Sequence, residues 1–225
     1  MSEEVKYLDK DGVERFLRRL GGEWLKDYGE NNYKHVVWRT YLDGAVVDEV
    51  LEEDQLDSIS GWKYQSEDID TVVALDGAVS GNSAAYTFYC CTKLSKAFLS
   101  DLDTSSLTDA SCMFDCCTSL EGITGELDFS GITSYTTYFT DYAFRNCTSL
   151  TSVYIKGLRT SLNLSYCPLT VECAAYLLEN LGDIYNSSYA TITFDADMQD
   201  EYEADGDFET YSLIAETNGW TITYA

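Results

Sequence analysis

Residues 103–120 read DTSSLTDASCMFDCCTSL, and a spacing inside this stretch recurs on both sides of it. A phenylalanine is followed three residues later by a cysteine and six residues later by a leucine. The spacing occurs three times, in steps of 26 and then 30 residues. Such a period is typical of a stacked solenoid, in which no single unit buries its apolar face alone. The residues that carry it are Phe88, Cys91 and Leu94, then Phe114, Cys117 and Leu120, and then Phe144, Cys147 and Leu150.

The composition excludes several classes of protein. The chain has 225 residues, of which 45% are hydrophobic, so it can bury a core and is not disordered as a whole. It contains no run of about 18 apolar residues that would span a membrane. With 14 basic and 39 acidic residues its net charge is −25, which should repel nucleic-acid phosphates and anionic lipids. We therefore expect neither nucleic acid nor membrane as a partner.

Four regions separate by pattern. Residues 1–32 are predicted to form a helical attachment segment, with Asp9 as the N-cap, and residues 33–70 a small β element with a hairpin turn at Asp43-Gly44. Residues 71–168 carry the repeats, and residues 169–225 should form an α/β cap with helices near 171–181 and 208–215 and strands at 190–194 and 220–224. The apolar residues that give the first region its helical spacing are Leu8, Val13, Phe16, Leu17, Leu20 and Trp24.

The stretch from Asp103 resembles the BspA-type leucine-rich repeat, whose units read like DTSNVTDMSYMFYGCSSL. AFRNCTSLTSVYI from Ala143 is similar to a related variant, AFxxCxSLxxV. The chain departs from the pattern at Ala110 and Cys112, which stand where Met and an aromatic are usual. The resemblance covers about 100 residues and implies an α/β fold: a short leucine-rich-repeat solenoid with parallel strands. The matching residues are Asp103, Thr104, Ser105, Thr108, Asp109, Ser111, Met113, Phe114, Cys117, Ser119 and Leu120.

The eight cysteines are predicted to be mostly reduced and buried. Many leucine-rich repeats place Asn or Cys at the inward-turning position, which here would form a ladder of thiols. Zinc is the alternative, but the vicinal pairs Cys90-Cys91 and Cys116-Cys117 lack the two-residue gap with which two thiolates hold one ion. Disulfides are less expected still for a cytoplasmic product. The only histidine, His35, is expected to be a strand residue.

Two further resemblances concern context. YLDKDGVERFLRRL from Tyr7 is similar to the opening of virion and tail-associated proteins of phages and prophages of gut bacteria. The ending, NGWTITYA, resembles the carboxy-terminal cap of BspA-repeat proteins from the same setting. The segment MSEEVKYLDKDG has early glutamates and no apolar stretch, so it is not expected to act as a secretory signal. Together these features favour a phage structural protein located in the virion, with a bacterial cell-surface adhesin as the alternative.

Catalysis finds little support in the sequence. There is no GxSxG or GxxxxGK[ST] motif, and so many carboxylates make a chance pair unavoidable, so we expect no enzyme and no cofactor. Glu201, Glu203, Asp205 and Gly206 match the first positions of a calcium-binding EF-hand loop. Ser212, at the twelfth position, cannot supply the bidentate carboxylate, so an acidic solvated loop is the preferred interpretation and no metal is expected.

Tyrosines are the sequence's candidate binding residues. The chain has 18, and the longer second repeat interval adds Tyr135, Tyr138 and Tyr142 among serines and threonines. Such a composition suits recognition of a glycan or a protein, although packing between coils is the alternative. We expect host-surface glycan or protein to be one partner and other virion proteins to be another, attached through Phe16, Leu20 and Trp24. Whether the chain forms a homo-oligomer stays open.

Overall fold

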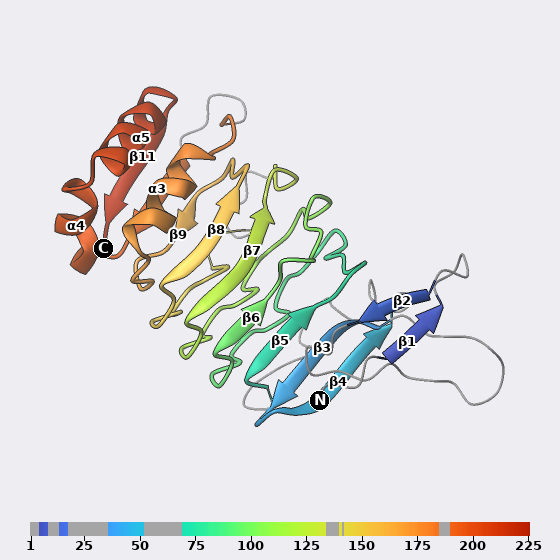
Figure 1. Ribbon diagram of the computed structural model, residues 1–225. Coiled ribbons are helices and arrows are strands. Elements are labelled where there is room, and N and C mark those ends of the chain that lie inside the picture. Colours follow the sequence, from blue (N-terminus) through green and yellow to red (C-terminus); the bar gives the residue numbers. More distant parts are fainter. Residues whose placement is uncertain are drawn as a thin grey trace.

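A computed structural model describes residues 5–8, 14–17, 36–51, 69–133, 140, 142–184 and 190–225. The fold is mixed α/β, with a sheet of mainly parallel strands and few helices (Figure 1). The central sheet has six strands in the order β4-β3-β5-β6-β7-β8, and a second sheet has the order β11-β10-β9. The strands of the central sheet are β3 (Val36–Leu42), β4 (Ala45–Leu51), β5 (Thr71–Ala74), β6 (Lys96–Phe98), β7 (Gly122–Asp128) and β8 (Ser152–Lys156).

The predicted N-terminal helix is wrong. The structure instead has two short strands, β1 (Val5–Leu8) and β2 (Glu14–Leu17), paired antiparallel with Val5 opposite Leu17. The sequence between them contains Asp11-Gly12, a dipeptide typical of hairpin turns. Strand pairing, and not the helical spacing of the apolar residues, therefore decides the structure of residues 14–17.

The hairpin predicted at Asp43-Gly44 is confirmed. Asp43 and Gly44 both have positive φ, 52° and 77°, as a type I′ turn requires. The turn joins β3 to β4, and β3 then pairs antiparallel with β5. The Trp38 ring lies 6.3 Å from the ring of Phe88, so the hairpin closes one end of the core of the repeats.

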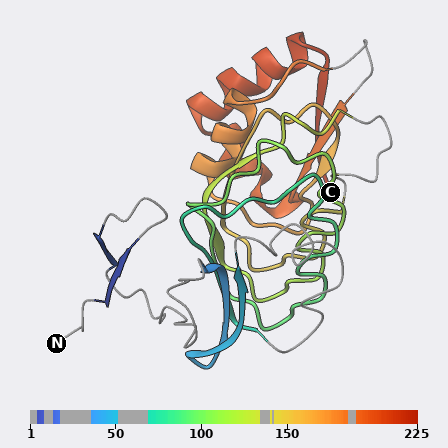
Figure 2. The ribbon, with the colours of Figure 1, turned by 90° about the vertical axis from the view of Figure 1, so that its right-hand side faces the viewer.

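The strands predicted at the repeats are also confirmed. β5, β6 and β7 pair in parallel and in register, so that Val72, Ala97 and Ile123 align on the buried face. The view in Figure 2 shows the successive chain segments following one another in nearly the same outline. The short strand β9 (Leu162–Asn163), which also lies within the repeat region, does not join this sheet and pairs with β10 of the second sheet.

The carboxy-terminal cap forms where the sequence predicted it. Helix α3 (Val171–Glu179) begins at the N-cap Thr170, and α5 (Gly206–Thr217) ends at Asn218 before Gly219. Strands β10 (Ala190–Phe194) and β11 (Trp220–Tyr224) pair in parallel. The acidic stretch expected as a loop is instead helical, in η2 (Ala196–Met198) and α4 (Gln199–Glu203), because buried Tyr202 holds it to the core.

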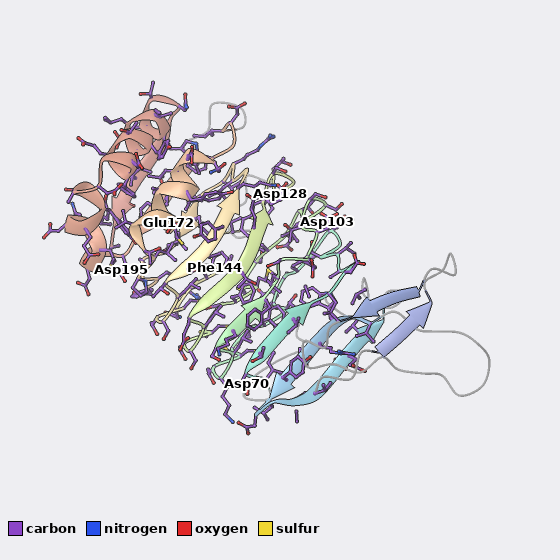
Figure 3. The ribbon with its side chains drawn as sticks, viewed as in Figure 1. Asp70, Asp103, Asp128, Phe144, Glu172 and Asp195 are labelled. Carbon is purple, nitrogen blue, oxygen red and sulfur yellow. The ribbon has the colours of Figure 1, made fainter. Side chains whose placement is uncertain are left out.

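Aspartates begin several of the turns that follow strands. The side chains of Asp103, Asp109 and Asp128 each accept a hydrogen bond, at 2.9 Å, from the backbone N–H two residues later. Asn163 does the same at the last repeat. Figure 3 shows Asp103 and Asp128 on the side where the parallel strands end, with Asp70 on the side where they begin. Part of the acidic excess is thus structural, since such local hydrogen bonds define turns.

Candidate functional site

All nine residues of the repeat signature are buried in the core. The three phenylalanine rings stack, with centroids 5.1 Å apart between Phe88 and Phe114 and 5.7 Å apart between Phe114 and Phe144. None of the nine is available to a ligand, so the signature is structural. These residues are Phe88, Cys91, Leu94, Phe114, Cys117, Leu120, Phe144, Cys147 and Leu150.

The predicted ladder of thiols is present. The Sγ of Cys117 donates to the carbonyl oxygen of Phe88 at 3.1 Å, and the Sγ of Cys147 donates to that of Phe114 at the same distance. Cys167 continues the ladder with a 3.4 Å bond to the carbonyl of Phe144. Burial raises the pKa of each of these thiols, to about 12 for Cys167, so they stay neutral and poorly reactive. All eight cysteines are free thiols.

The first cysteine of each vicinal pair, Cys90 or Cys116, lies beside this ladder. Cys90 and Cys116 are half-buried and have left-handed backbones, with φ of 58° and 63°, and Asn146 has the same conformation at 61°. Within the described residues, no three His, Cys, Asp or Glu side chains gather as metal ligands would. Asp205, the best candidate for calcium, instead accepts hydrogen bonds from the backbone of Asp207 and Phe208 as the N-cap of α5.

Tyr142 is the one predicted binding tyrosine that the structure describes, and it belongs to a polar cluster. The guanidinium carbon of Arg145 lies 4.4 Å from the centre of its ring. Arg145 also donates from Nε to Asp115, at 3.0 Å, and Asp115 is 0% exposed. This buried carboxylate needs its partner, since an unpaired buried charge is strongly destabilising. Arg145 therefore has a structural role, and the binding role of Tyr142, which packs on its guanidinium, stays a prediction.

Several predicted site residues lie outside the described residues. These are Tyr135 and Tyr138 of the repeat insertion and Leu20 and Trp24 of the attachment segment. Phe16 lies in β2, opposite Lys6. Their proposed roles stay predictions.

The sheet presents a second face, opposite the core, which we call the outer sheet face. It includes Thr71, Val73, Lys96, Phe98, Thr124, Glu126 and Tyr154, which alternate with buried residues along their strands. Strand register places Val73, Phe98 and Thr124 side by side on it. Residues that alternate out of a sheet and are not covered by the core are free to meet a partner.

One end of the outer sheet face is occupied by helix α3. The Tyr154 and Tyr176 rings meet edge to face at 5.1 Å, and the Tyr176 hydroxyl donates to Glu126. Lys156 pairs with the same carboxylate, and these two hydrogen bonds, that of Lys156 first, lower the pKa of Glu126. The polar groups at this end satisfy one another.

The other end of the outer sheet face contains a cavity of about 480 Å³. It lies where the antiparallel hairpin β3–β4 meets the parallel strands β5, β6 and β7. Small-molecule sites typically have volumes of about 300–1,000 Å³. The lining residues are Tyr41, Gly44, Thr71, Val73, Ala74, Leu75, Phe98, Ser100, Asp101 and Thr124.

Sequence reasoning missed this cavity. Its residues come from the hairpin and from three strands spread between residues 41 and 124. The sequence instead placed the candidate binding residues in the tyrosine-rich insertion. One local signal was available. In the strand Lys96–Phe98 the buried residue is Ala97, so Phe98 lies on the opposite, exposed face and is 42% exposed. The cavity beside this ring, rather than the exposed ring alone, marks a candidate binding surface.

Comparison with known protein families, with curated proteins and with solved structures finds no match for this chain. Over the ranges that the structure describes, none of the helices has the length and apolar character needed to cross a lipid bilayer. The site must therefore be interpreted from its own geometry.

Proposed function

We propose that this chain is a non-enzymatic component of a phage virion that binds host-surface glycan or protein. In this proposal, residues 71–168 form a short solenoid of BspA-type leucine-rich repeats, and the amino-terminal segment attaches to other virion proteins. The repeats would display the outer sheet face to the host.

The repeat assignment is supported by the stacking of equivalent residues. In-register parallel strands, a stack of phenylalanines and a ladder of thiols all follow the same period. In such a stack each unit buries its apolar face against its neighbours, and both ends must be closed. Trp38 at one end and the α/β cap at the other provide that closure.

A binding role is supported above all by the open cavity on the outer sheet face, which combines an exposed aromatic side chain with several polar groups. A binding site is expected in a hollow of this kind, lined mainly by apolar groups with a few convergent polar ones. The strongly negative net charge favours neutral or cationic partners.

The test is to purify phage particles from the native host and detect this protein in them by mass spectrometry and immunogold labelling. We expect it to co-purify with particles and to be labelled on their exterior. Finding it only as free protein, absent from purified particles, would overturn the virion proposal.

A surface adhesin of the BspA type is the second candidate, because the same repeat and the same outer sheet face would serve it. Fractionation of the cells that produce the protein separates the two proposals. An adhesin must be recovered with the cell envelope in the absence of particles, whereas a virion component must follow the particles.

A further inference from the structure

We propose that the cavity on the outer sheet face binds one ring of a neutral saccharide. This inference rests on the proposed function, because it names the ligand class that the same face would recognise. Three features support it: an exposed ring, a set of polar groups at the cavity and the charge of the chain.

Tyr41 adds a second ring to the lining, on the same face as its register partner Thr71. Its side chain is 8% exposed, and its hydroxyl oxygen is buried without a hydrogen-bond partner among the described residues. Because the oxygen itself is not exposed to the cavity, the ring and not the hydroxyl is the part that a ligand can meet.

The exposed ring belongs to Phe98, which register places between Val73 and Thr124. Because the ring is 42% exposed, it presents apolar surface on which the C–H groups of a pyranose can pack. Val73 and Leu75 extend this apolar surface within the cavity.

The polar groups of the cavity suit the hydroxyl edge of a sugar. Ser100 donates to the Thr124 hydroxyl at 3.3 Å, and Asp101 adds a carboxylate that accepts hydrogen bonds. A wholly apolar ligand would bury these groups without replacing their bonds to water, which costs free energy. A ligand with one apolar face and several hydroxyls satisfies both kinds of lining.

Charge selects among saccharides. The described residues that line the cavity include Asp101 and no lysine, arginine or histidine, and the whole chain carries a net charge of −25. On the same face, Arg39 is paired with Glu49, and Lys96 lies opposite Thr71 outside the lining. A sialic or uronic acid would meet repulsion from Asp101 and from the net charge. The ligand expected is therefore a neutral hexose or N-acetylhexosamine within a surface glycan.

The experiment titrates the full chain with methyl hexosides and N-acetylhexosamines, followed by ligand-observed NMR and calorimetry. Sialic acid and glucuronic acid form the anionic arm, and p-cresol forms the apolar arm. We expect a dissociation constant of about 1 mM for at least one neutral sugar, and binding at least about tenfold weaker in both other arms.

Three variants locate the site. Phe98→Ala should weaken sugar binding about tenfold or more, since it removes the stacking surface. Tyr41→Phe should raise the thermal midpoint of the free protein, because it deletes a buried hydroxyl that has no partner among the described residues, and should leave sugar binding within about twofold of the wild type. Tyr166→Ala, an aromatic residue that is 56% exposed and outside the cavity lining, is the matched control and should bind as the wild type does.

The outcomes divide clearly. No binding in the neutral arm, equal binding in the anionic or apolar arm, or neutral binding unaffected by Phe98→Ala would each overturn the saccharide site. If the site fails in this way while the protein still co-purifies with particles and adsorbs to host cells, the proposed function stands and the ligand lies elsewhere. If the protein is absent from particles and yet binds the sugar through Phe98, the site stands and the virion role fails.

Discussion

At the scale of single residues, the ladder of thiols accounts for the cysteine in the repeat. The carbonyl oxygen of each repeat phenylalanine accepts a hydrogen bond from the thiol of the next repeat. Each of these carbonyls already accepts the backbone N–H of the cysteine three residues later, and the thiol of the next repeat adds a second hydrogen bond while remaining small and apolar enough for the core. The recurring Phe and Cys, three residues apart, are therefore the acceptor and the donor that link each repeat to its neighbours.

The ladder predicts a loss of stability in alkali. Burial raises the pKa of the Cys167 thiol from 9.0 to about 12, so its contribution is complete below pH 9 and is lost as the pH rises through about 12. Urea unfolding measured across this range should show the free energy of unfolding falling with pH. Cys167→Ala should make the slope smaller, and a wild-type stability that does not change with pH would contradict the prediction.

Gly125 predicts a sharp steric effect. Its φ is +94°, and a Cβ there would lie 2.7 Å from the Cα of Ser100, which is backbone and cannot move aside. Gly125→Ala should lower the free energy of unfolding by about 2–4 kcal/mol, measured by chemical denaturation. The control is Gly206→Ala, in a position with no atom within 4 Å of the added Cβ, which should change stability by less than about 0.5 kcal/mol. Equal effects of the two substitutions would show the steric argument to be wrong.

At the scale of elements, the cap depends on how its helices begin. The Asp205 carboxylate accepts from the backbone N–H groups of both Asp207 and Phe208, at 3.0 and 2.9 Å. Helix α5 thereby starts directly before buried Phe208, whose ring packs against Phe194 of β10. The N-cap thus fixes which face of the helix meets the sheet.

Removing this cap should destabilise the protein. Asp205→Ala should lower the free energy of unfolding by about 1 kcal/mol, because two backbone donors lose their acceptor. Asp205→Asn keeps an acceptor oxygen and should cost only a few tenths of that amount. The measurement is thermal unfolding followed by circular dichroism, and an Asn variant as unstable as the Ala variant would rule out capping as the cause.

Elements whose signals lie close together in the sequence were predictable, and elements that depend on distant partners were not. The helix near residues 171–181, the Asp43-Gly44 hairpin and the parallel strands of the repeats were all predicted correctly. At residues 14–17, helical spacing was misleading because strand pairing decided the outcome. The cavity could not be predicted, since Tyr41 and Phe98 come to line the same cavity only because β3 pairs with β5 and β5 pairs with β6.

At the scale of the whole molecule, one continuous core runs from the hairpin through the repeats to the cap. Trp38 begins it, and Trp220 of β11 belongs to the same cluster. The large negative charge is spread over a thin stack around this core, so like charges lie close to one another. Self-repulsion of this kind opposes the folded state.

Salt should therefore stabilise the protein. Raising the NaCl concentration from about 10 mM to about 1 M shortens the screening length from about 30 Å to about 3 Å and weakens the repulsion within the net charge of −25. Calorimetry should show the thermal midpoint rising by several degrees, about 2–4 °C for each kcal/mol gained. NaCl is preferred to sulfate, which strengthens apolar burial by another mechanism. A midpoint that falls with NaCl would contradict the prediction.

The near-equal stacking of Phe88, Phe114 and Phe144 has a consequence for how such a chain changes over generations. Phe114 has the same kind of neighbour on both sides, so in the solenoid proposed above a whole unit could be copied or removed while each interface keeps its type. The hairpin and the cap would each be needed once, whatever the copy number. The exposed face between the two ends could then lengthen or shorten while the ends stay unchanged.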